Sequence, residues 1–125
     1  MGMDIYGRKP KTATGTGVYF RFSVWAWRPM LAIMTLAGCD IPKSWNYNDG
    51  EGPNDQASCT ILAEKIESFM AQCDDSDLTL PAHPHLMINK SGMFQEGQFS
   101  PYKITREHVA DFCAFLRNCE GFQIF

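Results

Sequence analysis

The chain has 125 residues and a net charge of −3, and 45% of its residues are apolar and 13% aromatic. This length and apolar fraction predict one domain spanning residues 1–125, with a substantial hydrophobic core. The small negative charge gives no general attraction to phosphate backbones, so it argues against nucleic acid as a partner.

The N-terminal residues predict two strands joined by a loop. Residues 3–6 alternate apolar and polar side chains, as a half-buried strand does, and the turn-rich residues 7–17 predict an exposed loop. Alternation then continues over residues 18–27. It predicts a second strand with one apolar face and a second, mixed face that carries both Trp25 and Trp27.

A short buried helix and a long loop are expected next. Pro29 suits the first position of a helix because its missing amide would be unpaired there anyway, and Gly38 suits the helix end. The apolar residues 30–37 between them predict a helix buried on nearly every side. Residues 40–54 hold the densest turn-forming sequence of the chain and predict a long irregular loop.

Two longer helices are predicted from apolar residues at helical spacing. The first begins at an N-cap residue, Asn54, and the second begins at Thr105 and stops at Gly121. Between them, residues 74–104 predict short strands and a hairpin, and residues 122–125 predict a closing strand. This order predicts an α+β fold, with about three helices packed on an antiparallel or mixed sheet.

The five cysteines predict a reducing environment. Their odd number, and the polar residues 1–15, which lack the apolar segment of a signal peptide, predict a cytoplasmic protein. Cys59, Cys73 and Cys113 lie on the predicted apolar helix faces, where they would serve as small buried hydrophobic residues. The longest apolar stretch, residues 30–37, is about half as long as a membrane span, so no membrane partner is expected.

No residue pattern predicts a catalytic or metal centre. His83 and His85 are two positions apart, but no second pair of ligands completes a zinc site. The loop around Asp49 is rich in oxygen ligands, yet aligning its glycines with a calcium loop places an aromatic residue at the first ligand position. His108 and Cys113 are five positions apart and would not face one another on a helix. The sequence therefore predicts neither a metal nor a cofactor, and it gives an enzyme no support.

The concentration of tryptophan and arginine around residues 20–29 is the main functional signal. These residue types dominate the binding energy of protein interfaces, because they combine a large area with directional polar groups. Burial in the core is the alternative role for tryptophan, which small domains bury when its N–H is satisfied. The candidate partner-binding residues are Arg21, Trp25, Trp27, Arg28, Trp45, Asn48 and Asp49.

Four segments together resemble a group of small uncharacterised proteins from bacteriophages and prophage-bearing bacteria. They are MGMDIYG at 1–7, FRFSVWAWRP at 20–29, WNYNDGEG at 45–52 and FCAFLRNCEGFQI at 112–124. The resemblance carries no known activity or site residue. The resemblance implies a phage or mobile-element origin. Together with the small size of the chain, this origin leads us to expect a non-catalytic accessory protein that acts in the bacterial cytoplasm by binding a host protein, for example as an anti-CRISPR type inhibitor of host defence.

Two alternatives from other classes stay open. The first is a protein that binds or sequesters a small ligand, with residues 45–52 closing over a nucleotide whose base stacks on an aromatic ring. The second is a small enzyme, which would need a buried pocket with hydrogen-bonded catalytic side chains.

Overall fold

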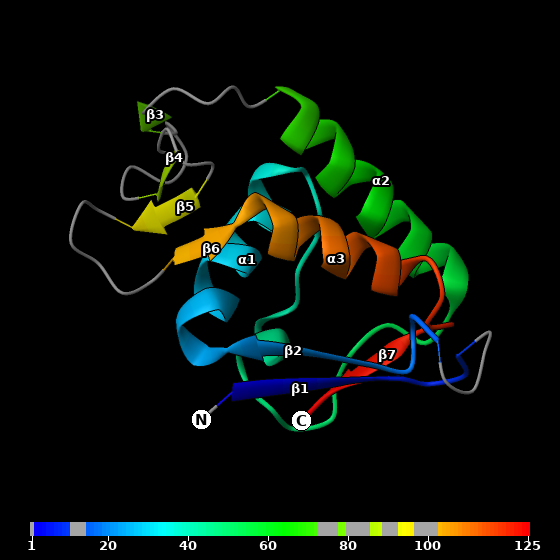
Figure 1. Ribbon diagram of the computed structural model, residues 1–125. Coiled ribbons are helices and arrows are strands. Elements are labelled where there is room, and N and C mark those ends of the chain that lie inside the picture. The colour runs from blue at the N-terminus through cyan, green and yellow to red at the C-terminus, as the bar shows by residue number, and fades with distance from the viewer. Residues whose placement is uncertain (1, 11–14, 73–77, 80–85, 89–92, 97–102) are drawn as a thin grey trace.

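The computed structural model of the chain describes residues 2–10, 15–72, 78–79, 86–88, 93–96 and 103–125. In chain order the elements are β1 (Gly2–Gly7), β2 (Tyr19–Ser23), α1 (Val24–Leu36), the 3-10 helix η1 (Lys43–Asn46), α2 (Gln56–Gln72), β3 (Leu78–Thr79), β4 (Leu86–Ile88), β5 (Met93–Glu96), β6 (Lys103–Thr105), α3 (Arg106–Leu116) and β7 (Phe122–Ile124). They form one small α+β domain, which confirms the predicted fold class (Figure 1).

The strands form two antiparallel sheets. In the first, β1 lies between β2 and β7, and Ile5 of β1 is opposite Phe20 on one side and Ile124 on the other. The second sheet has the order β3-β4-β5-β6. Within it, β4 pairs with β5 through the register Ile88 to Phe94, the two segments that the sequence suggested as a hairpin. Figure 1 shows α3 between the first sheet and α2, so the domain is layered.

The predicted second strand ends earlier than the alternating pattern indicates. Strand β2 stops at Ser23, and α1 begins at Val24, because the Ser23 side chain accepts a hydrogen bond from the backbone N–H of Ala26 at 3.2 Å and caps the helix. Pro29 is therefore inside α1 rather than at its first position. The residues after Ser23 follow a period of 3.6 instead of 2, which separates side chains that a strand would place together.

The helix ends agree in part with their sequence signals. Gly38 follows α1 with a φ of +91°, and the N–H of Cys39 bonds to the carbonyl of Met34 at 2.9 Å, as in a Schellman motif. Thr105 caps α3 as predicted and accepts the N–H of His108 at 3.1 Å.

Two helix boundaries differ from the prediction. The cap of α2 is Asp55 rather than Asn54, since Asp55 accepts the N–H of Ser58 at 2.8 Å. Helix α3 stops at Leu116, so Gly121 lies in the turn before β7 instead of ending the helix.

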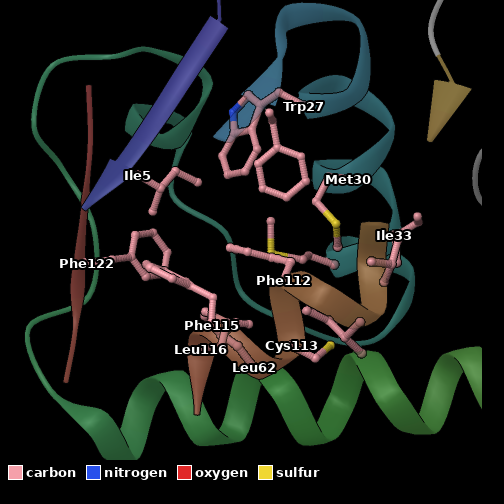
Figure 2. Packing of buried hydrophobic residues seen from close by; sticks show 14 of the residues in the cluster. Ile5, Trp27, Met30, Ile33, Leu62, Phe112, Cys113, Phe115, Leu116 and Phe122 are labelled. Atoms are coloured by element: carbon pink, nitrogen blue, oxygen red, sulfur yellow. The ribbon is translucent and has the colours of Figure 1, made fainter. Parts of the chain in front are cut away.

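The core lies between the first sheet and the helices. Phe112 of α3 stands at its centre, where its ring centroid is 4.9 Å from that of Phe22, 6.4 Å from Trp27 and 6.2 Å from Phe122 (Figure 2). Leu62 of α2 closes the core from the far side of α3. Phe22, Phe112 and Phe122 come from a strand, a helix and another strand, so these elements share a single core.

The loop over residues 40–54 is more ordered than its composition indicates. It contains η1, and its last residues run along the free edge of β7. The N–H of Gly50 bonds to the carbonyl of Ile124 at 2.7 Å, and the N–H of Ile124 bonds to the carbonyl of Glu51 at 3.0 Å. The loop therefore protects one edge of the sheet.

Candidate partner-binding surface

Two of the three tryptophans predicted to bind a partner belong to the core. Trp27 is only 3% exposed, and its Nε1 donates a hydrogen bond to the backbone carbonyl of Trp45 at 2.8 Å. Trp45 is also buried, with its ring centroid 5.4 Å from that of Phe122. Both indoles pack against the core, so we remove Trp27 and Trp45 from the candidate surface.

Helical geometry explains why the two neighbouring tryptophans differ. Trp25 and Trp27 are two positions apart on α1, which turns their side chains roughly 200° apart around the helix axis. Trp25 is accordingly 48% exposed, and Arg28, three positions further on, is exposed as well. Trp25 and Arg28 therefore stay in the candidate surface.

The other three candidates are exposed but do not form one cluster. Arg21 points outward from β2, in the sheet. Asn48 and Asp49 lie in the loop just before Gly50, which bonds to Ile124 of β7. The predicted set is thus divided between the start of α1, the sheet and the loop beside β7.

Three exposed aromatic residues that the sequence analysis did not select form a cluster. Tyr6 of β1, Tyr19 of β2 and Phe125, which follows β7, are each between 45% and 47% exposed. The Tyr6 ring centroid is 5.1 Å from that of Tyr19 and 6.0 Å from that of Phe125. We call these three residues the aromatic face; each is next to a residue that packs in or against the core (Ile5, Phe20 and Ile124), so the alternation of side chains along extended backbone places all three on the solvent side of the sheet.

The strand register brings the aromatic face together. Tyr6 and Tyr19 are direct partners across β1 and β2, and both occupy outward positions, because Ile5 and Phe22 point into the core. The alternating apolar and polar side chains within residues 3–6 and within residues 18–23 indicated that these tyrosines point outward. It could not show that they are opposite one another, and no pattern marked Phe125.

A carboxylate orders the polar part of this surface. Asp4 accepts a hydrogen bond from the Tyr19 hydroxyl at 2.5 Å, and its Oδ1 lies 3.9 Å from Nε of Arg21. The hydrogen bond to Asp4 raises the pKa of Tyr19 above its usual value. The protonated hydroxyl donates to Asp4 and holds the Tyr19 ring in place beside Tyr6.

Three titratable side chains that pack in or against the described core are Cys39, Cys113 and His108. Burial raises the pKa of the Cys39 thiol, and it raises that of Cys113 to about 12, so neither forms a thiolate nucleophile near neutral pH. His108 instead stacks on Phe22 with ring centroids 4.7 Å apart. Its Nε2 lies within hydrogen-bonding distance, 3.1 Å, of the carbonyl of Arg21.

The part of the chain that the structure describes contains no candidate metal site. No three His, Cys, Asp or Glu side chains in this part are grouped closely enough to hold an ion. The predicted pair His83 and His85 lies outside the described residues.

One pocket bears on the small-ligand alternative. It has a volume of about 320 Å³ and lies between the 40–54 loop and α2. Trp45, Ile61 and Leu62 give it apolar walls, and Cys39 and Lys65 contribute polar groups. This volume is near the lower limit for pockets that enclose a small molecule.

Comparison of the chain with protein-family models, with curated protein sequences and with solved structures gave no match. Among the described helices, none is both long and apolar enough to cross a membrane. The functional conclusion therefore rests on the surface geometry.

Proposed function

We propose that the chain is a non-catalytic binding protein whose aromatic face docks against a partner protein. The observation that carries the proposal is the contact of three half-exposed aromatic rings on one side of a sheet, with Arg21 beside them. Tyrosine and arginine are the residue types most enriched at the dominant positions of interfaces. The largest exposed apolar patch of a monomeric protein is often functional.

The size of the aromatic face suits the centre of an interface. Three rings of this kind at half exposure present roughly 300 Å² to solvent. A standard interface buries about 800 Å² on each partner. The rings would thus supply more than a third of that area, and Asp4, Arg21 and Gln123 would form a polar rim around them.

The partner that we propose is a bacterial host protein, and the support for this choice is the sequence resemblance. A likeness to phage and prophage proteins supports a partner in the cytoplasm of a bacterial host, and inhibition of a host defence system is the most concrete version. The proposed mechanism is steric. The aromatic face covers a functional surface of the host protein, which requires no catalytic residue and no cofactor.

Affinity capture from a bacterial host lysate tests this proposal. The wild-type chain is compared with Tyr6→Ala and with the matched control Ile61→Ala, which removes a side chain that is 51% exposed on α2, in the outer helical layer. We expect one host protein to be retained by the wild type and by Ile61→Ala, and to be reduced at least about fivefold by Tyr6→Ala. Equal capture by all three would refute the proposal.

A small-ligand binder is the second candidate function, and the pocket beside Trp45 is the observation that favours it. Native mass spectrometry of the protein purified from cells distinguishes the two. A bound small molecule that Ile61→Ala loses and Tyr6→Ala keeps would establish this alternative, because Ile61 lines the pocket. If the wild-type protein carries no bound small molecule, the result would count against the small-ligand alternative.

A further inference from the structure

Two buried cysteines lie in contact although they are far apart in the sequence. Cys59 is in the first turns of α2, and Cys119 is in the turn that joins α3 to β7. Their Sγ atoms are 3.5 Å apart, and both residues are fully buried. The apolar stripe of the predicted helix places Cys59 in the core, but no sequence pattern indicates a contact with Cys119.

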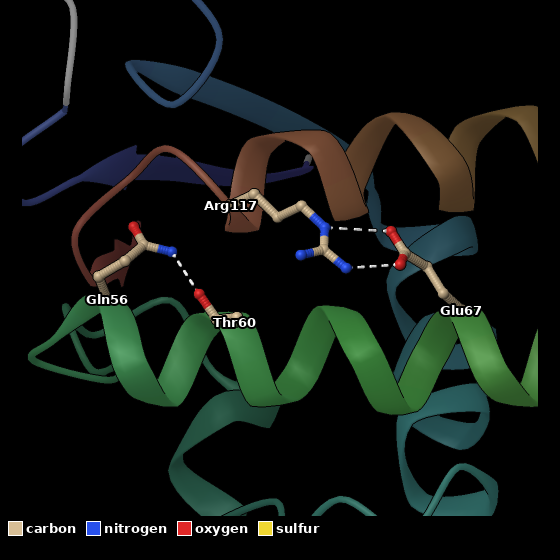
Figure 3. A network of polar contacts seen from close by, with 4 residues as sticks. All are labelled: Gln56, Thr60, Glu67 and Arg117. Atoms are coloured by element: carbon tan, nitrogen blue, oxygen red, sulfur yellow. Dashed lines mark hydrogen bonds and ion pairs between the residues drawn. The ribbon is translucent and has the colours of Figure 1, made fainter.

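The backbone segments that carry the two thiols are held in place by Gln56. Its Nε2 donates to the hydroxyl of Thr60 at 3.0 Å (Figure 3). The same Nε2 donates to the carbonyl of Leu116 at 2.8 Å, and Oε1 accepts the N–H of Glu120 at 2.9 Å. The side chain thus links the start of α2 to both ends of the turn that contains Cys119.

An ion pair on the surface adds a second link between the two helices. Nη2 of Arg117, at the end of α3, lies 2.6 Å from Oε2 of Glu67 on α2 (Figure 3). With the segments fixed on both sides, the approach of the two sulfur atoms is a property of the fold rather than of a freely moving side chain.

We propose that Cys59 and Cys119 form a redox pair that closes to a disulfide when the protein meets a peroxide. The sulfur atoms of a disulfide are about 2.05 Å apart, so closure brings the two Sγ atoms roughly 1.5 Å closer together. This inference does not depend on the proposed function, because neither cysteine belongs to the aromatic face.

The chemistry balances with hydrogen peroxide as the oxidant. One thiolate attacks the peroxide, the O–O bond breaks, and the sulfur becomes a sulfenic acid while hydroxide leaves and takes up a proton. The second sulfur then displaces hydroxide from the sulfenic acid, the S–S bond forms, and a second water leaves. Two thiols are oxidised and one peroxide is reduced to two waters.

The two thiols also interact with each other. The Sγ–H of Cys119 donates to the Sγ of Cys59, and the backbone N–H of Gly121 lowers the pKa of both thiols. Either sulfur can attack the peroxide, and the other then resolves the sulfenic acid, with the same disulfide as the product.

Cys39 provides an internal control within the same chain. It is 8% exposed, whereas Cys59 and Cys119 are fully buried. If access to solvent decided which cysteine is oxidised, Cys39 would react before the pair. If the proximity of two sulfur atoms decides, the pair closes while Cys39 stays a free thiol.

The test is peptide mapping of the wild-type protein after treatment with hydrogen peroxide. We expect a mass loss of about 2 Da, a cross-linked peptide that joins Cys59 to Cys119, and Cys39 free to react with an alkylating agent after unfolding. The proposal is overturned if Cys39 is oxidised while Cys59 and Cys119 remain alkylatable, or if either member of the pair proceeds to sulfinic acid without the cross-link.

A second measurement follows the effect on stability. A disulfide that closes a loop of this length is expected to raise the melting temperature by roughly 10 °C under non-reducing conditions, and dithiothreitol should reverse the rise. The matched variants are Cys119→Ala, which should lose the rise, and Cys113→Ala, which should keep it. A peroxide-dependent rise that persists in Cys119→Ala would contradict the pairing.

Discussion

Alanine substitution of the two neighbouring tryptophans of α1 should change the stability of the protein to very different extents. Trp27→Ala removes an indole that is 3% exposed, packs against Phe22 at a centroid distance of 5.0 Å and donates to the carbonyl of Trp45. Trp25→Ala removes an indole that is 48% exposed. We expect the first variant to be strongly destabilised and the second to unfold nearly as the wild type does.

The magnitudes follow from burial and from the lost hydrogen bond. Truncating a buried tryptophan to alanine costs about 3–5 kcal/mol of unfolding free energy, which for a domain of this size is a fall in melting temperature of roughly 10 °C or more. An exposed substitution changes stability by less than about 0.5 kcal/mol. Trp27→Phe keeps most of the packing and leaves the Trp45 carbonyl without its donor, a loss of about 1–3 kcal/mol.

Urea unfolding followed by far-ultraviolet circular dichroism measures these differences without relying on the fluorescence of the residues that are changed. The wild type and Trp25→Ala should have the highest urea midpoints, close to one another. Trp27→Phe should have a lower midpoint, and Trp27→Ala the lowest. A Trp25→Ala midpoint as low as that of Trp27→Ala would show that both indoles are buried and would refute the helical assignment of residues 24–27.

Three further variants test the helix ends. Ser23→Ala should lower the unfolding free energy by about 1 kcal/mol in urea denaturation, because the N–H of Ala26 loses its acceptor; an unchanged midpoint would place the start of α1 elsewhere. Gly38→Ala should cost about 1 kcal/mol by the same assay, since φ is +91° there while open space surrounds the position, and a stabilised variant would contradict the left-handed turn. The hydrogen bond from Ser58 lowers the pKa of Asp55, so its contribution to stability is fully present above its unfolded pKa and is lost as pH falls through the lower folded value. Melting curves at several pH values should show this loss in the wild type and not in Asp55→Asn; identical profiles would count against the cap.

The sequence predicted the kinds of elements better than their boundaries. The strand at 3–6 and the helices with clear apolar stripes were found because their periodicities are unambiguous. Residues 18–27 were misassigned beyond Ser23 because the four apolar residues 24–27 extend the alternating pattern of the strand and fit a buried helix equally well. The signal that separates the two is Ser23, a residue that caps helices, and its cap ends the strand.

The candidate surface was less predictable because it depends on pairing between distant segments. Arg21 and Trp25 were selected by residue type and are indeed exposed. Tyr6 and Tyr19 become neighbours only through the register of β1 and β2, and Phe125 joins them only through the position of β7. Local sequence patterns contain no information about that register beyond which side chains point outward.

The central claim is that the aromatic face contacts the partner, and the affinity of the captured host protein tests it most directly. Isothermal titration calorimetry of that protein with Tyr19→Ala should give a dissociation constant at least about five times weaker than with the wild type. The Ile61→Ala control should bind as the wild type does, and circular dichroism should show both variants folded. An unchanged dissociation constant for folded Tyr19→Ala would contradict the account.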